Sequence, residues 1–146
     1  MRGTTVGVLL ATALCGCGGG QQFANEARPA VPVNLSVYIS DVRVLVSPSS
    51  VGAGPVSFIV TNQGMRTESL RIARAANGAA LARTGPINPQ ATAQITVNFN
   101  VPGEYTVSAG AGGRTDAQLT LPSPIRPAAL HIGRKRPNSS GTLLQP

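Results

Sequence analysis

The sequence has few of the side chains that carry out chemistry. It contains one histidine, five acidic residues, two cysteines and no tryptophan among its 146 residues. It has no Gly-rich phosphate loop, no Gly-x-Ser-x-Gly turn, no His-Glu-x-x-His motif and no carboxylate pair on adjoining strands. Ser47, Ser49 and Ser50 flank Pro48, and without a nearby histidine or lysine base we interpret them as turn residues. These absences argue against an enzyme.

The composition also disfavours helices. The chain has 17 glycines and 12 prolines, which suit a domain of strands and turns better than a helix bundle. Its length is enough for one domain. We therefore predict a single all-β domain.

The first 17 residues have the pattern of a secretory leader. Arg2 supplies a positive charge, and an uncharged run of about 11 residues ends at Leu14, too short for the ~30 Å core of a bilayer. The segment Leu14-Cys15-Gly16-Cys17 resembles the bacterial lipobox, in which a small residue and glycine precede the lipidated cysteine. The resemblance implies that Cys17 carries diacylglycerol and a fatty acid such as palmitate. Cys15 fits less well, because Leu14 precedes it.

A plain secretory signal cleaved near residues 18–20 is the alternative. With lipidation, residues 1–16 are the signal peptide and residues 17–32 a flexible tether, and no free thiol or disulfide remains. Lipid chains stabilise the bound state by about 0.8 kcal/mol per buried CH₂. We expect a protein anchored at the extracytoplasmic face of the cell membrane.

Residues 33–121 contain short alternating apolar runs separated by turn residues. Apolar residues occupy odd positions up to Ile39 and even positions from Val42, and a bulge or bend near Ser40-Asp41 would account for this change. Residues 75–83 are interpreted as a connection with a helical turn. The expected strands cover residues 33–39, 42–46, 56–60, 68–73, 93–99, 105–107 and 117–121. About seven strands in about 90 residues predict a Greek-key β-sandwich.

Three segments, in this order, resemble the cupredoxin family of blue-copper-type sandwiches. Residues 48–64 are similar to its segment of proline, glycine, a strand and an Asn-x-Gly turn. Residues 87–97 are similar to the start of a later strand, with Gln90 in place of the usual glycine, and Pro102-Gly103-Glu104-Tyr105 is similar to the strand that leads to the copper loop. The resemblance implies a cupredoxin-like fold over most of residues 33–121.

The same resemblance implies that the copper ligands are missing. A type 1 copper site requires two imidazoles, a thiolate and a weak axial thioether. The two histidine positions fall at Glu68 and near Arg114, the cysteine position falls near Ala109, and no methionine follows. We expect no metal and no cofactor. Glu68 and Arg114 could form an ion pair or remain separately solvated.

Residues 122–146 contain five prolines and the basic group Arg134-Lys135-Arg136, so we predict a disordered tail that includes a solvated His131. The net charge of +7 favours weak, salt-sensitive attraction to anionic headgroups or envelope polymers. No aromatic side chains are interleaved with the basic ones, which argues against nucleic acid.

These observations predict a lipid-anchored cupredoxin-like domain without a copper site. Its expected role is that of a binding or structural module at the bacterial cell envelope, with an envelope protein or an anionic polymer as partner. Two alternatives are a copper-binding or electron-transfer cupredoxin relative and an immunoglobulin-like adhesive or assembly domain.

Overall fold

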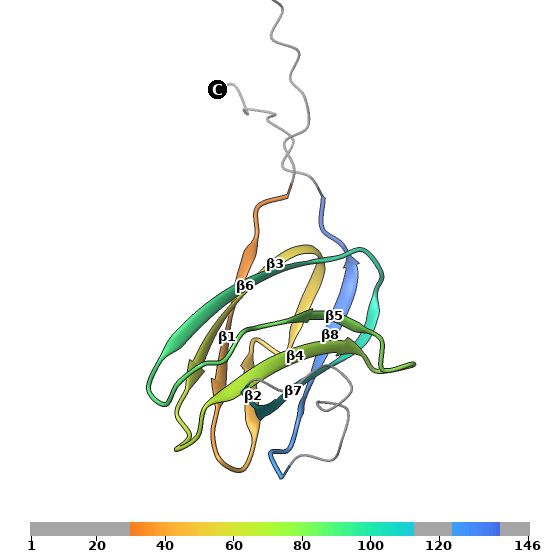
Figure 1. Cartoon of the computed structure of the whole chain (residues 1–146). Helices are drawn as coiled ribbons and strands as arrows, with labels where there is room; N and C mark the ends of the chain where they lie inside the picture. Colours follow the sequence, from red (N-terminus) through yellow and green to blue (C-terminus); the bar gives the residue numbers. More distant parts are fainter. Residues whose placement is uncertain (1–29, 113–123, 138–146) are drawn as a thin grey trace, which may run out of the picture.

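The computed structural model describes residues 30–112 and 124–137, which form strands and turns (Figure 1). Residues 1–29, 113–123 and 138–146 lie outside this part, and with them the expected leader, Cys17, most of the tether, Arg114 and the predicted strand 117–121. No described segment forms a helix of the length and hydropathy that a membrane span needs. The described strands are β1 (Val33–Ile39), β2 (Val44–Ser47), β3 (Ser50–Asn62), β4 (Glu68–Arg74), β5 (Ala80–Arg83), β6 (Thr92–Phe99), β7 (Gly103–Ala111) and β8 (Ala128–Lys135).

The strands form two layers that share β3. The first sheet has the order β2-β1-β3-β6, and the second has the order β3-β8-β7-β4-β5. Residues 50–53 of β3 pair in parallel with β8, whereas residues 54–61 pair with β6. Gly54 lies at this crossover with φ of 133°, a conformation that favours glycine. The predicted all-β sandwich is confirmed, and β3 is the strand that takes part in both sheets.

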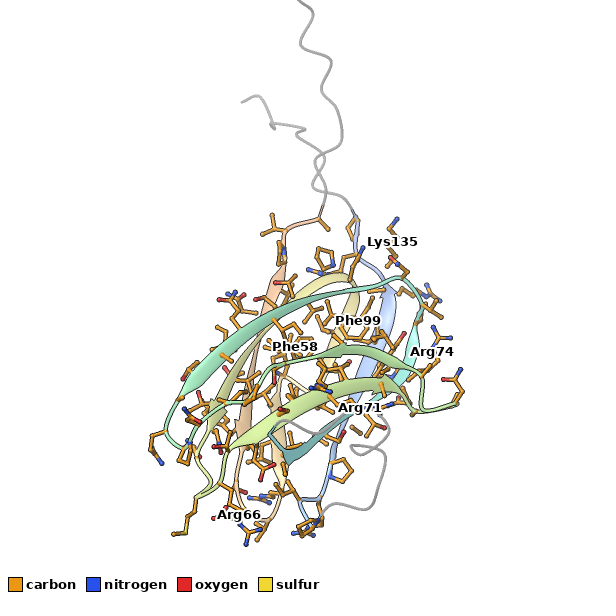
Figure 2. The ribbon with its side chains drawn as sticks, in the orientation of Figure 1. Phe58, Arg66, Arg71, Arg74, Phe99 and Lys135 are labelled. Carbon is orange, nitrogen blue, oxygen red and sulfur yellow. The ribbon has the colours of Figure 1, made fainter. Side chains whose placement is uncertain are left out.

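The core lies between the two sheets, and its aromatic side chains form one chain of contacts. Phe58 and Phe99 pack edge to face with ring centroids 6.1 Å apart, and Phe99 and Tyr105 do so at 4.8 Å. Figure 2 shows Phe58 and Phe99 inside the sandwich. The Tyr105 hydroxyl donates to the Val101 carbonyl at 2.7 Å, so this buried ring keeps a partner for its polar atom.

The connection after β1 is a hairpin turn rather than the predicted bulge or bend. The Ser40 amide donates to the Arg43 carbonyl at 3.0 Å, and Ile39 then faces Val44 across an antiparallel pair. The change of apolar parity between the two runs therefore marks a reversal of the chain. Val42, included in the expected strand 42–46, is 59% exposed and lies in the turn before β2.

The prediction of a disordered tail is wrong for residues 124–137. They include β8, which lies between β3 and β7, and Leu130 and Ile132 are completely buried. Three alternating apolar positions, Ala128, Leu130 and Ile132, provide the inward face of this strand. Prolines and arginines on either side dominate the composition, and a short strand can be stabilised by its two neighbours although its own pattern is weak.

The connection interpreted as helical contains β5 instead. The Gly78 amide donates to the Arg74 carbonyl at 2.9 Å, and Gly78 has φ of 67°, so the chain reverses after β4. Ala82 then pairs with Ile72 in the second sheet. Alanine has the higher helix propensity, but the available sheet edge outweighs this local preference.

Candidate functional site

The site builds on the turn between β3 and β4, which Asn62 holds in place. Asn62 is completely buried, and its amide nitrogen donates to the carbonyls of Arg66 at 2.7 Å and Ile87 at 2.9 Å. Its side-chain oxygen accepts from the Gly64 amide at 2.9 Å. All the polar atoms of this side chain therefore have partners, and they fix the turn against the segment before β6.

Asp41, from the β1–β2 turn, fixes the same end of the sandwich from the other side. Its carboxylate accepts from the Met65 amide at 2.9 Å. A Cβ atom at Gly64 would lie 2.8 Å from that carboxylate oxygen, so glycine allows the close approach of the two turns.

A cavity of about 280 Å³ opens beside this turn. Glu68 is 6% exposed at the start of β4, and its backbone pairs with Ile87 through hydrogen bonds of 3.1 and 2.7 Å. The cavity is lined by Asp41, Met65, Arg66, Glu68, Pro124 and Ile125. The carboxylate of Glu68 is thus held by a rigid strand at the edge of a solvent-connected space.

Three arginines surround this end, and we call them the distal arginines: Arg43, Arg66 and Arg126. All three are exposed. Arg43 and Arg126 are neighbours because the backbones of residues 42–44 and 126 exchange hydrogen bonds of 2.8 and 3.0 Å. Arg66 lines the cavity, as does Ile125 next to Arg126. Figure 2 shows Arg66 at the end opposite Lys135.

Two of the positions that the resemblance assigns to copper ligands lie in this region. Glu68 occupies the first histidine position, and Ala109, at the cysteine position, is 3% exposed on β7 opposite Leu70. A methyl group supplies no donor, and a carboxylate is not the imidazole that type 1 copper requires, so these residues do not fit that ion. Arg114 lies outside the described residues, so the expected choice between an ion pair and separate charges is untested there.

His131 lies elsewhere, on β8 rather than in the predicted disordered tail. Its Nδ1 atom is 2.6 Å from the Glu104 carboxylate on β7, and both side chains are more than half exposed. Glu104 and Ala109 are five positions apart on β7, which at about 3.3 Å per residue separates them by roughly 16 Å. Among the described residues, no group of three or more His, Cys, Asp or Glu side chains could hold a metal ion.

A second surface distinguishes the first sheet. Its strands contain no charged residue, and its outward side chains are hydroxyls, amides and three exposed larger groups, Tyr38, Leu45 and Ile59. We call this surface the neutral face. Its exposed and half-buried residues are Asn34, Ser36, Tyr38, Leu45, Ser47, Ile59, Thr61, Thr92, Gln94, Thr96 and Asn98. Ser57 lies among them but is 3% exposed, and its hydroxyl accepts a hydrogen bond from the Gln94 amide at 2.7 Å.

Sequence reasoning identified Glu68 and Ala109 but missed the distal arginines as a group. Arg43 and Arg126 come together through the pairing of residues 42–44 with 126, and Arg66 is brought to the same end where the Met65 amide bonds to Asp41. The alternating apolar residues around Leu130 could have indicated this group, because they predict a strand that brings the preceding Arg126 to the sandwich.

Comparison with known proteins defines the class of fold. No family model and no curated protein matches the sequence. The structure is similar to an azurin from the methylotroph Methylomonas sp. strain J, with a TM-score of 0.50 and 10% identity, over 71% of this chain and 100% of the azurin. An auracyanin from Roseiflexus castenholzii matches with a TM-score of 0.47 and 10% identity, over 72% and 98% of the two chains. Auracyanin A from Chloroflexus aurantiacus, a blue copper protein, matches with a TM-score of 0.46 and 13% identity, over 70% of this chain and 100% of the auracyanin.

The chain therefore has a cupredoxin-like fold, as the three segments predicted. At this level of identity the likeness concerns the fold alone, and function must be argued from the site.

Proposed function

We propose that this protein is a lipid-anchored, cupredoxin-like binding module without a copper site and without enzymatic activity, which holds an anionic polymer of the bacterial envelope at the distal arginines. The observation that carries the proposal is the end of the sandwich itself. Where the resemblance expects copper ligands, the chain has Glu68 and Ala109, and the exposed Arg66 lines a cavity there. Arg126 follows the lining residue Ile125, and Arg43 pairs with Arg126.

The position of this end supports binding away from the membrane. The described chain begins before β1 and ends after β8 at one end of the sandwich, and Arg66 lies at the other (Figures 1 and 2). Arg43 lies between β1 and β2 and pairs with Arg126, which precedes β8. A lipid on Cys17 would hold the first end near the membrane. Arg134 and Lys135, both exposed at that end, would then face anionic headgroups, which attract basic side chains by about 1 kcal/mol each.

Polyanion binding tests the proposal with charge-matched variants. Fluorescence anisotropy with labelled polyphosphate of defined length should show binding by the full chain that weakens between 50 and 300 mM salt, roughly as expected for a few charge contacts. Arg43→Ala/Arg126→Ala should raise the dissociation constant about tenfold. Arg134→Ala/Lys135→Ala, which removes the same charge at the other end, should raise it less than about threefold. Equal losses in both variants would show a response to net charge alone.

Metabolic labelling with a fatty-acid analogue tests the anchor. The wild-type protein and Cys15→Ser should be labelled and should sediment with membranes, and Cys17→Ser should be neither labelled nor membrane-bound. Label retained in Cys17→Ser and lost in Cys15→Ser would move the lipid to Cys15.

Copper titration tests the runner-up, a copper carrier. With its N-terminal amine blocked, the protein should show no intense blue absorption band, because no thiolate is available for charge transfer. Tight stoichiometric copper binding that a substitution within residues 33–112 abolishes would favour the carrier instead.

A further inference from the structure

The described sheets end in three strands that pair on one side only: β2, β5 and β6. Unpaired sheet edges invite association, and proteins protect them with short strands, prolines, bulges or charges. β2 has four residues, precedes Pro48, and Val44 donates its amide to the Arg126 carbonyl. β5 also has four residues, pairs across a shift in register and carries Arg83. Both of these edges are protected.

β6 has none of these protections. It has eight residues, none of them proline, glycine or charged, and it pairs with β3 without a break in register. Its outward side chains, Thr92, Gln94, Thr96 and Asn98, are all exposed. A long, regular and neutral edge in a protein of net charge +7 is therefore a place where another strand can add without meeting a cation.

The backbone groups that point away from β3 belong to the even-numbered residues of β6. Asn62 donates its amide to the Ala91 carbonyl, so residues 91, 93, 95, 97 and 99 face β3. The hydroxyls of Thr61 and Thr92 lie 3.2 Å apart, as expected for a pair without backbone hydrogen bonds. Within residues 30–112 and 124–137, no other strand pairs with the outward groups of Thr92, Gln94, Thr96 and Asn98.

We propose that β6 is a self-association edge at which two copies of this chain pair antiparallel. A two-fold axis at Ile95 places Gln94 opposite Thr96 and Thr92 opposite Asn98 of the partner subunit. In this register the outward even-numbered residues meet one another and form roughly eight backbone hydrogen bonds.

Side chains support the same register. Because the strand period is two, the half-buried Ala93 and Ile95 face the inner side of the joined sheet, with Ile95 against its own copy. On the outer side, hydroxyls and amides meet across the axis, and the neutral faces of the two copies become continuous. A second copy suits this edge because β6 has no charged residue, so pairing two copies brings no like charges together. The distal arginines lie outside β6 and take no part in this pairing. The inference is therefore independent of the proposed polyanion binding.

In the antiparallel pair the tethered ends of the two copies point in opposite directions, so anchoring both copies in one membrane requires the tether of one copy to run past the sandwich. The expected tether of residues 17–32 reaches up to about 50 Å when extended. That exceeds the roughly 43 Å that the 13 residues of β3 span.

Charge substitutions at the edge provide the first test, by sedimentation of the full chain in detergent over a range of concentrations. The wild type should self-associate. Gln94→Lys/Thr96→Lys puts lysine opposite lysine twice and should raise the dimer dissociation constant at least about tenfold, whereas Gln94→Lys/Thr96→Glu puts opposite charges together and should change it less than about threefold. Both variants lose the same Gln94–Ser57 hydrogen bond, so they are matched for folding. A wild type that stays monomeric, or two variants that associate equally, would overturn the proposal.

Disulfide formation in native membranes tests the register directly. In the proposed pairing, residue 95 faces its own copy at a pair without backbone hydrogen bonds, where the backbones approach to about 4.5 Å and a disulfide can form. Ile95→Cys should therefore give a disulfide-linked dimer on non-reducing gels. Ala93→Cys, on the same strand and face, is displaced from its copy by four residues and should not. Equal cross-linking of both variants, or none, would contradict this register.

Discussion

The two sheets pack against one core but differ in their outer faces. On the first sheet, Tyr38 and Ile59 are 39% and 38% exposed, and no charged residue is present. On the second sheet, the outward side chains of β4 are buried, including Arg71 at 8% exposure. Arg71 donates to the Gly78 carbonyl and so ties the β4–β5 turn to the sheet.

This difference indicates that one sheet face contributes to stability and the other is available for association. A face with buried polar groups is committed to the fold, since each of its polar atoms needs a partner. A face that is neutral and solvated makes few demands on the fold and remains available for contact. We therefore expect substitutions on the outward side of β4 to affect stability, and those on the neutral face and the β6 edge to affect association.

Removal of β8 should unfold both sheets and so abolish the difference between them, because β8 is the strand that connects β3 to β7 in the second sheet. A chain that ends at Ser123 should lose its cooperative thermal transition, since the burial of Leu130 and Ile132 is lost with it. A chain that ends at Pro137 keeps β8 and is the control. Differential scanning calorimetry measures both, and a melting temperature of the shorter chain within a few degrees of that of the full chain would contradict the role of β8.

The inner and outer sides of one strand provide the next comparison. Phe58 is completely buried, so Phe58→Ala should lower the free energy of unfolding by about 3–5 kcal/mol. Its neighbour Ile59 is on the neutral face, and Ile59→Ala should cost less than about 1 kcal/mol. Denaturant titrations followed by circular dichroism give both values. Similar losses would mean that the neutral face is as tightly packed as the core.

Arg71 tests the outer face of the second sheet. Arg71→Ala removes the hydrogen bond to the Gly78 carbonyl and should destabilise the domain by about 1.5–3 kcal/mol. Ser36→Ala, on the neutral face, should change stability by no more than about 0.5 kcal/mol. If the two substitutions have equal effects in urea titrations, the outer faces do not differ as described.

The smallest expected effect concerns a single hydroxyl. Tyr105→Phe removes the bond to the Val101 carbonyl and should cost about 1 kcal/mol, because the ring keeps its packing against Phe99. Tyr38→Phe, on the neutral face, is the control and should be nearly neutral. Thermal melts compare the two, and an unchanged Tyr105→Phe would show that water replaces the lost partner.

Much of the first sheet could be predicted from the sequence. Alternation around Leu35, Phe58 and Ile95 locates β1, β3 and β6, because each of these strands has one face in the core and one in solvent. β8 was missed because its pattern is short and lies among prolines. β5 was misassigned because alanines favour a helix locally, although the free edge of β4 favours a strand.

The candidate site was predictable at only some of its positions. Glu68 and Ala109 followed from motif order, since the Asn62-x-Gly64 turn and the strand at Tyr105 can be recognised one by one. The distal arginines and the β6 edge could not be predicted, because both depend on which strands become neighbours.

The sequence by itself determined the alternating strands, the turns between them and the scarcity of reactive side chains. These are local properties: the period of two follows from strand geometry, and the turns follow from glycine, proline and asparagine conformations. Only the tertiary structure decided that residue 126 meets residues 42–44, that β3 serves two sheets and that β6 is left at an edge. Such contacts depend on closing long loops and on burying a shared core, and no single segment contains that information.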